Sequence, residues 1–185
     1  DPLILAGIVS DFRVINGQRG KLALFKLDDK TAVVEAAADE AVLNACKGLL
    51  KEDELLIISG KLQRDRFSGG MRLNVQQVWD LPTARCRFGR FLRVVVGAQA
   101  PDAGDVARLV RDFPPRREVL EEGGETLQFG LEVRLALQCT APQGRAAVEL
   151  SLGEKGRIYP TDAALASWLA QAEQGQATIV YDPDA

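Results

Sequence analysis

The fold is decided by residues 21–50, which read KLALFKLDDKTAVVEAAADEAVLNACKGLL. The first part of this stretch alternates in hydrophobicity, which is typical of a strand with one buried face. One face of that strand carries Ala23, Phe25 and Leu27, and the other face carries Leu22, Leu24 and Lys26. Aspartate favours turns, so Asp28-Asp29 predicts a turn into a further strand that runs from Thr31 to Ala36.

The second part of the stretch has helical spacing instead. Its apolar residues recur at the helical period, at Val42, Leu43, Cys46, Leu49 and Leu50. Asp39 precedes them and is a suitable N-cap, because its carboxylate can accept hydrogen bonds from the unpaired amides of a first helical turn. We therefore expect a helix from Asp39 to Leu50, soon after the strand.

The flanking segments add three more strands. These are a β-rich run from Leu3 to Ile15, an apolar run from Leu55 to Ile58 that Gly60 interrupts, and an alternating run from Met71 onward. The turn signals Asn16-Gly17 and Ser68-Gly69-Gly70 stand before the second and the last strand. Five strands with a helix between the third and the fourth is the order of an OB-fold barrel, which we assign to residues 1–80.

A different pattern begins after residues 81–90, which are basic, lack a strand pattern and are interpreted as a connector. The expected strands are Phe91 to Val96, one continuous strand from Leu127 to Leu137, Ala146 to Leu152, and Ala177 to Tyr181. The expected helices are Val106 to Phe113 and a second one that is capped by Thr161 or Asp162 and contains Trp168. This order is that of a small α/β domain with a split βαβ layer, residues 91–185. The fold class is therefore mixed, a five-stranded OB-fold barrel followed by an α+β domain.

The composition favours binding over catalysis. The chain has 185 residues, a net charge of -3 and no histidine, which removes the usual general base and most catalytic zinc sites. Cys46, Cys86 and Cys139 are far apart, which argues against a disulfide framework or a structural zinc and favours a reducing cytoplasm. We expect no catalytic residue, no metal and no cofactor. No apolar run approaches the ~20 residues of a membrane helix, so we expect no membrane partner.

Six basic residues flank the predicted hairpins of the barrel, namely Arg13, Arg19, Lys21, Arg64, Arg66 and Arg72. OB-folds bind single strands on the face of their second and third strands and through hairpin loops, where cations contact phosphates. Phe67 lies among them and is more typical of hairpin packing than of base stacking. The alternative interpretation is a solvated barrel rim, because lysine and arginine also protect strand edges against aggregation. With a net charge of -3, any contact with nucleic acid is local.

Several stretches resemble the OB-fold near the C-terminus of the bacterial DNA polymerase III alpha subunit. They are Ala6 to Val9, the hairpin from Arg13 to Gly20, Phe25 to Asp29, Ile57 to Gly60 and Phe67 to Gly70. Arg157 to Asp162 and the closing strand are similar to the last domain of the proteobacterial branch of that family. The start at Asp1, without a methionine, fits a segment of a longer chain.

The resemblance implies a non-catalytic part of a replicative DNA polymerase. In that family the catalytic aspartates lie in a palm domain upstream, the OB-fold contacts single-stranded template DNA, and the last domain binds the tau subunit of the clamp loader. The expected partners are therefore single-stranded DNA, tau and the rest of the polymerase III holoenzyme, in the bacterial cytoplasm at the nucleoid. We expect the six basic residues to contact phosphates, and the tau surface to lie near the last helix and strand.

Other functions remain open. A stand-alone OB-fold adaptor in DNA repair or translation would bind mainly protein, without measurable affinity for single strands. An OB-containing enzyme fragment, such as the anticodon-binding part of a synthetase, would prefer structured RNA, which the second domain fits poorly. The related error-prone polymerase also has an OB-fold, but we expect it to lack the tau-binding domain, so residues 91–185 argue against it.

Overall fold

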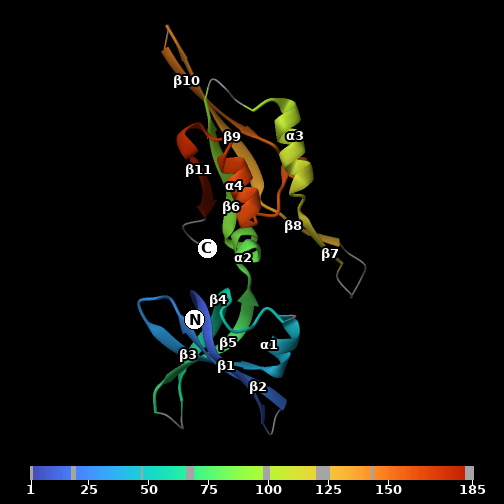
Figure 1. Cartoon of the computed structure of the whole chain (residues 1–185). Coiled ribbons are helices and arrows are strands. Elements are labelled where there is room, and N and C mark those ends of the chain that lie inside the picture. The colour runs from blue at the N-terminus through green and yellow to red at the C-terminus, as the bar shows by residue number, and fades with distance from the viewer. Residues whose placement is uncertain are drawn as a thin grey trace. The chain divides into compact units, whose positions relative to one another are not determined.

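The computed structural model describes residues 2–17, 20–46, 48–65, 69–97, 101–119, 126–142 and 144–181. The chain divides into two compact units, Asp1–Leu81 and Pro82–Ala185 (Figure 1). Arg19, Arg66 and Phe67, which the sequence singled out, lie outside the described residues.

The first unit is a closed barrel of five strands in the order β1-β2-β3-β5-β4. Its elements are β1 (Leu3–Gly17), β2 (Gly20–Asp28), β3 (Val33–Asp39), α1 (Glu40–Ala45), β4 (Leu55–Arg64) and β5 (Met71–Trp79). The parallel pair of β3 and β5 closes the barrel, and its other strand pairs are antiparallel. With α1 between β3 and β4, this is the OB-fold order, so the predicted barrel is confirmed.

Strand alternation fills the barrel, as the sequence of β2 indicates. Ala23, Phe25 and Leu27 are buried and pack with Val9 in one apolar cluster. The residues between them project from the opposite face of the strand and stay half-buried, Lys26 among them. The inner face of the barrel is therefore its core, and the outer face is only partly covered.

Strand β4 is longer than the apolar run at its start, because Gly60 does not end it. A Cβ on Gly60 would run into the backbone carbonyl oxygen of Asn74 on β5, so glycine allows the close approach of the two strands. The register of the pair shifts between Ser59 and Gly60, as at a β-bulge, and the strand then continues to Arg64.

Helix α1 begins as predicted and ends early. The Asp39 carboxylate caps it, because its Oδ1 accepts a hydrogen bond from the backbone N–H of Val42 at 2.9 Å. The helix ends at Ala45, and Gly48 then takes a left-handed φ of 79°, a conformation that cannot continue a helix. Leu50, the expected last residue, is buried in the barrel core from the loop that follows.

The second unit is a four-stranded sheet in the order β10-β9-β6-β11, beside a two-stranded sheet of β7 and β8. Its strands are β6 (Gly89–Val96), β7 (Arg116–Val119), β8 (Thr126–Phe129), β9 (Glu132–Ala141), β10 (Gly144–Ser151) and β11 (Ala177–Tyr181). Its helices are α2 (Leu81–Phe88), α3 (Ala103–Asp112) and α4 (Asp162–Leu169), with short 3-10 turns at η1 (Glu154–Gly156) and η2 (Glu173–Gly175). The expected α+β class is confirmed.

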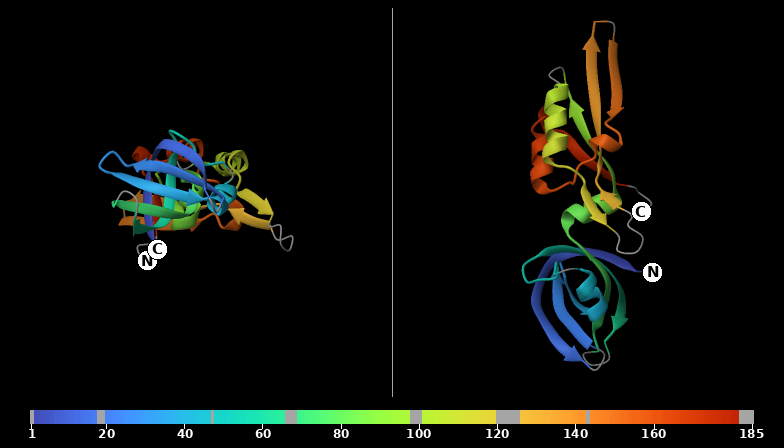
Figure 2. Two further views of the ribbon diagram at one scale, coloured as in Figure 1. Left: turned by 90° about the horizontal axis from the view of Figure 1, so that it is seen from below. Right: turned by 90° about the vertical axis from the view of Figure 1, so that its right-hand side faces the viewer.

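The parallel strands β6 and β9 are direct neighbours, joined through α3, so the βαβ unit is not split by another strand. Helices α3 and α4 supply Leu109 and Trp168 to a buried cluster that includes Val94 and Val133 of these strands. The helices therefore cover one face of the sheet. Figure 2 shows that the hairpin of β9 and β10 projects past the end of α3.

The alternating run from Leu127 to Leu137 is not one strand, contrary to the prediction. Strand β8 pairs with β7 in a separate sheet, and β9 begins after it. Gly130 lies between the two strands, where a Cβ would approach the Cβ of Pro115 to 2.8 Å. Leu131 then forms a bridge with Ile158. A long-range backbone contact therefore interrupts a pattern that reads locally as one strand.

Residues 81–88, expected as part of a connector, form helix α2. The Oγ1 of Thr83 lies 3.1 Å from the hydroxyl of Tyr159, and Arg85 donates a hydrogen bond to the Asp162 carboxylate at 2.7 Å. These contacts attach the helix to the start of α4 and to the segment before it, so it is an element of the second unit.

Candidate nucleic-acid interface

A groove of about 520 Å³ lies on the outer face of the barrel, across β1, β2, β3 and β5. It is lined by Asp11, Phe12, Arg13, Leu24, Phe25, Lys26, Glu35, Ala36 and Arg72. The second and third strands, which OB-folds use to bind single strands, supply five of these nine residues. We call this surface the barrel groove.

Strand register gathers the polar side chains of the barrel groove into one row. Lys26 on β2 is paired with Ser10 on β1 and with Glu35 on β3, and Glu35 is paired with Arg72 on β5. Cross-strand partners project from the same face of a sheet. A row of alternating charge therefore crosses three strands on the outside of the barrel.

Lys26 is held by Asp11. The Nζ of Lys26 lies 2.7 Å from Oδ2 of Asp11, and the two side chains are 44% and 68% exposed, respectively. The hydrogen bond and the charge of Lys26 lower the pKa of Asp11, and those of Asp11 raise the pKa of Lys26. Both groups are therefore charged at neutral pH.

A bulge in β1 directs Asp11 toward the groove. The register of β1 with β2 shifts between Ser10 and Arg13, and Asp11 takes a left-handed φ of 53°. The carboxylate of Glu52 accepts hydrogen bonds from the backbone N–H of Asp11 at 3.0 Å and of Phe12 at 2.8 Å. A residue from the loop before β4 therefore fixes the conformation of the bulge.

Arg72 is more firmly paired than Lys26. Its Nη2 lies 2.9 Å from Oδ2 of Asp65, and 3.9 Å from Oε2 of Glu35. The side chain of Asp65 is only 7% exposed and that of Arg72 is 25% exposed. Because the carboxylate of Asp65 is buried, this pair holds the β4–β5 hairpin as well as a cation at the groove.

Arg13 is the least restrained cation of the barrel groove. It pairs with Leu24 in the register of β1 and β2, it is exposed, and it makes no ion pair with any residue that the structure describes. Phe12 precedes it and is half-buried at the groove, whereas Phe25 is buried beneath it. An available guanidinium next to a partly exposed ring suits a phosphate and a base of one nucleotide.

The structure brings together two of the six basic residues chosen from the sequence. Arg13 and Arg72 line the groove. Lys21 and Arg64 do not line it. Each stands near the end of its strand, at a position that follows the alternation of the inward-facing residues of β2 and β4 rather than that of the outward-facing ones. The Nε of Arg64 instead donates a hydrogen bond to the carbonyl of Gly69 in the β4–β5 turn.

Sequence reasoning missed Lys26 as a candidate contact. The signal for it was present, since Lys26 stands on the outward face of the alternating strand that also carries Leu22 and Leu24. The six predicted residues flank hairpins, whereas Lys26 stands in the middle of its strand.

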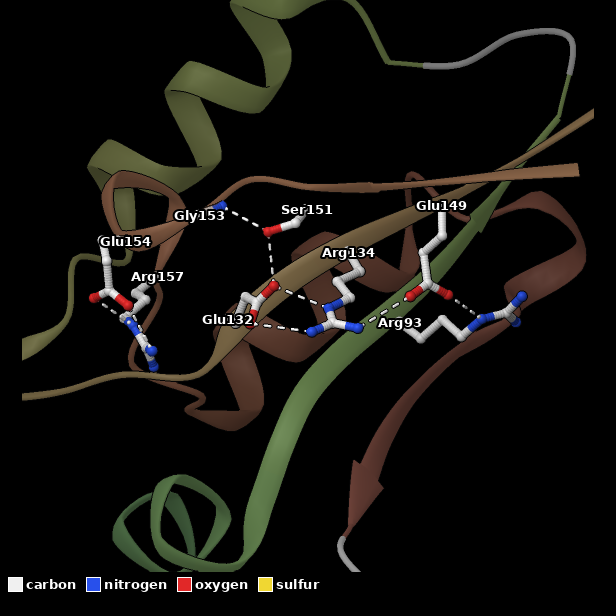
Figure 3. Close-up of polar contacts among 8 residues, drawn as sticks. All are labelled: Arg93, Glu132, Arg134, Glu149, Ser151, Gly153, Glu154 and Arg157. Carbon is white, nitrogen blue, oxygen red and sulfur yellow. Dashed lines mark hydrogen bonds and ion pairs between the residues drawn. The ribbon is translucent and has the colours of Figure 1, made fainter.

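The second unit carries a polar network on the sheet face opposite the helices (Figure 3). Arg134 bonds to Glu132 at 2.9 Å and to Glu149 at 3.3 Å, and Glu149 pairs with Arg93 at 3.2 Å. The guanidinium of Arg134 also lies 3.9 Å from the centre of the Phe91 ring. Each of these charges faces an opposite charge, which is typical of a structural network.

The hydrogen bonds from Arg134 and from the hydroxyl of Ser151 lower the pKa of Glu132. No group of three or more His, Cys, Asp or Glu side chains that could hold a metal ion occurs among the described residues. No helix in the described part of the chain is long and apolar enough to cross a membrane.

The comparisons with known proteins cover both units. A family model for the OB-fold nucleic acid binding domain matches residues 3–81. The DNA polymerase III subunit alpha of Neisseria meningitidis serogroup B is 38% identical over 112 residues, which are 60% of this chain and 10% of that protein. The subunit alpha of Pseudomonas fluorescens is 27% identical over 164 residues, which are 88% of this chain and 13% of that protein.

Among solved structures, the second single-stranded DNA binding protein (SSBb) of Mycobacterium smegmatis aligns with 43% of this chain and 87% of its own, with a TM-score of 0.38 and 12% identity. That likeness is too weak to bear on function. The chain spans about a tenth of the curated relatives that it matches. The predicted resemblance is confirmed to this extent: residues 3–81 match the family of OB-fold nucleic acid binding domains, and the chain is similar to part of DNA polymerase III alpha subunits.

Proposed function

We propose that the barrel groove binds single-stranded DNA, as part of a DNA polymerase III alpha subunit. The observation that carries this proposal is the set of cations, Arg13, Lys26 and Arg72, on the outer face of an OB-fold barrel. The cations contact phosphates, and the half-buried ring of Phe12 offers a surface on which a base can stack. Stacking tolerates any base, so we expect little sequence preference.

The barrel groove has a net charge close to zero, which limits its affinity for DNA. Three cations and two carboxylates line it, and the whole chain has a net charge of -3. Phosphate neutralisation supplies most of the non-specific affinity for DNA, so binding is weak in isolation and falls with salt. Such a barrel suits a template strand that a larger assembly already holds nearby.

We further propose that the second unit binds the tau subunit of the clamp loader, as the resemblance to the alpha subunit implies. The similarity to the Pseudomonas fluorescens subunit spans 88% of the chain and so reaches well beyond the barrel. In this proposal the chain contributes binding rather than catalysis to a cytoplasmic bacterial replisome. Polymerase activity belongs to other parts of the parent protein.

The DNA proposal is tested by fluorescence anisotropy with labelled oligothymidine. The Arg13→Ala/Lys26→Ala variant should bind about tenfold more weakly, because it loses two phosphate contacts. The matched control is Lys21→Ala/Arg64→Ala, which removes the same charge from the same barrel outside the groove. Equal losses in the two variants would assign binding to overall charge, and would contradict the barrel groove as the site.

The tau proposal is tested by isothermal titration calorimetry of the purified tau subunit against this chain. Saturable binding is expected, and it should be retained by the Arg13→Ala/Lys26→Ala variant, because the proposed tau surface lies in the second unit. Absence of binding would remove tau from the proposal and leave the DNA-binding part standing.

The ion pairs of the barrel groove favour a second candidate function, a protein-binding OB-fold adaptor. Lys26 already forms an ion pair with Asp11, and Arg72 forms one with Asp65. A surface of mixed charge of this kind can complement the mixed charges of a protein. Failure of the chain to bind oligothymidine even at low salt would favour this adaptor over the DNA-binding function.

A further inference from the structure

The second unit has an apolar groove of about 640 Å³ between helix α3 and the hairpin of β9 and β10. It is lined by Pro101, Ala103, Val106, Ala107, Val110, Arg111, Leu135, Leu137, Leu150, Leu152, Lys155 and Gly156. We call this surface the hairpin groove. Its volume falls in the range of about 300–1,000 Å³ that binding pockets occupy.

The hairpin groove lies beside β10, whose apolar residues the helices leave exposed. Leu150 on β10 pairs in register with Leu135 on β9, and Val148 pairs with Leu137, so all four project toward the helix side. Leu135 is buried in the core, but Leu150 is 49% exposed and Val148 is 60% exposed. The apolar face of the sheet therefore continues onto β10, an edge strand that projects past α3 (Figures 1 and 2).

Helix α3 presents a matching apolar wall. Leu109 of this helix is buried in the core, while Val106 and Val110 are half-buried and line the hairpin groove. A contiguous exposed apolar surface, such as the one between this helix and the hairpin, is typical of an interaction site. A helix laid beside α3 would extend the helix layer over β10 and bury both walls.

The charges at the hairpin groove indicate which charge a bound segment should carry. Arg111 and Lys155 line it, and none of its lining residues carries a carboxylate. Lys155 is exposed and makes no ion pair with a described residue, and Arg111 has only a 3.5 Å contact with the carboxylate of Asp112. Two available cations beside an apolar floor complement a segment that is apolar on one face and acidic on the other.

We propose that the hairpin groove docks a short amphipathic helix of a partner protein, with its apolar face on Leu150 and Val106 and its acidic residues toward Arg111 and Lys155. This is the helix-in-groove mode of recognition, in which apolar residues at helical spacing provide the anchors. The inference rests on the proposed role of the second unit in partner binding. It deepens that role by naming a surface at α3 and β10, rather than near the last helix and strand, and the chemistry of the bound segment.

The experiment uses a fluorescein-labelled peptide of about 15 residues, because shorter isolated helices are only marginally populated in water. It carries leucine at the i, i+3, i+4 and i+7 spacing of one face and glutamate on the opposite face. A second peptide has lysine in place of each glutamate. Binding to the complete chain is followed by anisotropy, and circular dichroism checks that each variant folds.

The acidic peptide should bind the chain, and the lysine peptide should bind it about tenfold more weakly. Leu150→Gln and Lys155→Glu should each weaken binding of the acidic peptide by about tenfold. Ala147→Gln is the control, because Ala147 is exposed on the same strand and projects to the other side of the sheet. Equal binding by Leu150→Gln and Ala147→Gln, or no preference for the acidic peptide, would overturn the inference.

The same variants separate this inference from the proposed function. One outcome is that Leu150→Gln leaves tau binding unchanged and that the acidic peptide does not bind. This outcome would reject the hairpin groove as the docking site, while tau binding would stand. Binding of the acidic peptide without any binding of tau would support the groove and reject tau as its partner.

Discussion

Lys26 and Asp11 face each other across β1 and β2 in the barrel groove, with 2.7 Å between Nζ and Oδ2. The contact is exposed, so it is easily broken. In the proposed DNA complex, the carboxylate that orients Lys26 would therefore also compete with a phosphate for this cation.

Removing Asp11 should strengthen binding to DNA. Asp11→Asn frees Lys26 and removes a negative charge from the groove, so we expect affinity for oligothymidine to rise by about threefold to tenfold and to fall more steeply with salt. Anisotropy titrations at two salt concentrations measure both effects. Glu54→Gln makes the same charge change on an exposed loop residue outside the groove and should have little effect.

Arg72→Ala should destabilise the barrel as well as weaken DNA binding. It leaves the buried carboxylate of Asp65 without its Arg72 partner, which costs about 2 kcal/mol in the free energy of unfolding. Urea denaturation measures this cost. The double variant Arg72→Ala/Asp65→Asn should recover part of the stability but not the DNA affinity. Loss of DNA binding without loss of stability would show that the Asp65 pair is not structural.

The stability of the second unit should depend on the ionisation of Glu132. Its pKa is lowered in the folded state by the hydrogen bonds from Arg134 and Ser151. The stabilisation that ionised Glu132 provides is therefore fully present above its ordinary pKa of 4.5, and it is lost as the pH falls through the lower pKa of the folded state. Glu132→Gln should therefore lower the free energy of unfolding by about 1 kcal/mol at neutral pH, and the difference should vanish in acid.

The measurement needs a reporter for the second unit alone. The chain has two tryptophans, so a Trp79→Phe background leaves Trp168, which is buried between α4 and the sheet, as the fluorescent probe. Urea unfolding in this background is compared with and without Glu132→Gln across the acidic range. A stability difference that stays constant from neutral pH to strong acid would contradict the linkage.

Gly60→Ala should destabilise the barrel by about 2 kcal/mol, because its methyl group would meet the carbonyl oxygen of Asn74 at the bulge of β4. Gly17→Ala is the matched control, since a Cβ there meets the carbonyl oxygen of Gly20 at 3.4 Å, an ordinary contact. Thermal unfolding followed by circular dichroism compares the two. Equal stability would mean that β4 and β5 separate without cost at this point.

The barrel could be predicted from the sequence because its signals are local. The alternation of Ala23, Phe25 and Leu27, the turn at Asp28-Asp29 and the cap at Asp39 each depend on neighbouring residues. The prediction of one strand from Leu127 to Leu137 failed because a residue that is distant in the sequence contacts the chain there. Gly130 divides the run between β8 and β9 because Pro115 lies against it, and nothing near Gly130 in the sequence indicates this contact.

The barrel groove was predicted only in part for a similar reason. The cations of β1 and β5 were predicted because they flank hairpins, but the residues that pair with them could not be predicted. Asp11 reaches Lys26 from a bulge whose backbone is held by Glu52, 41 residues away. The charge balance of the groove therefore arises from long-range contacts, and a sequence pattern gives only the side of the strand on which a cation stands.

The central claim is that single-stranded DNA lies on Arg13 and Lys26, and the salt dependence of binding tests it most directly. Each phosphate contact on a single strand contributes about 0.7 to the slope of log affinity against log salt concentration. We predict that the slope for Arg13→Ala/Lys26→Ala is smaller by about 1.4 than that of the parent chain, while Lys21→Ala/Arg64→Ala keeps the parent slope. An unchanged slope in the groove variant would contradict the account.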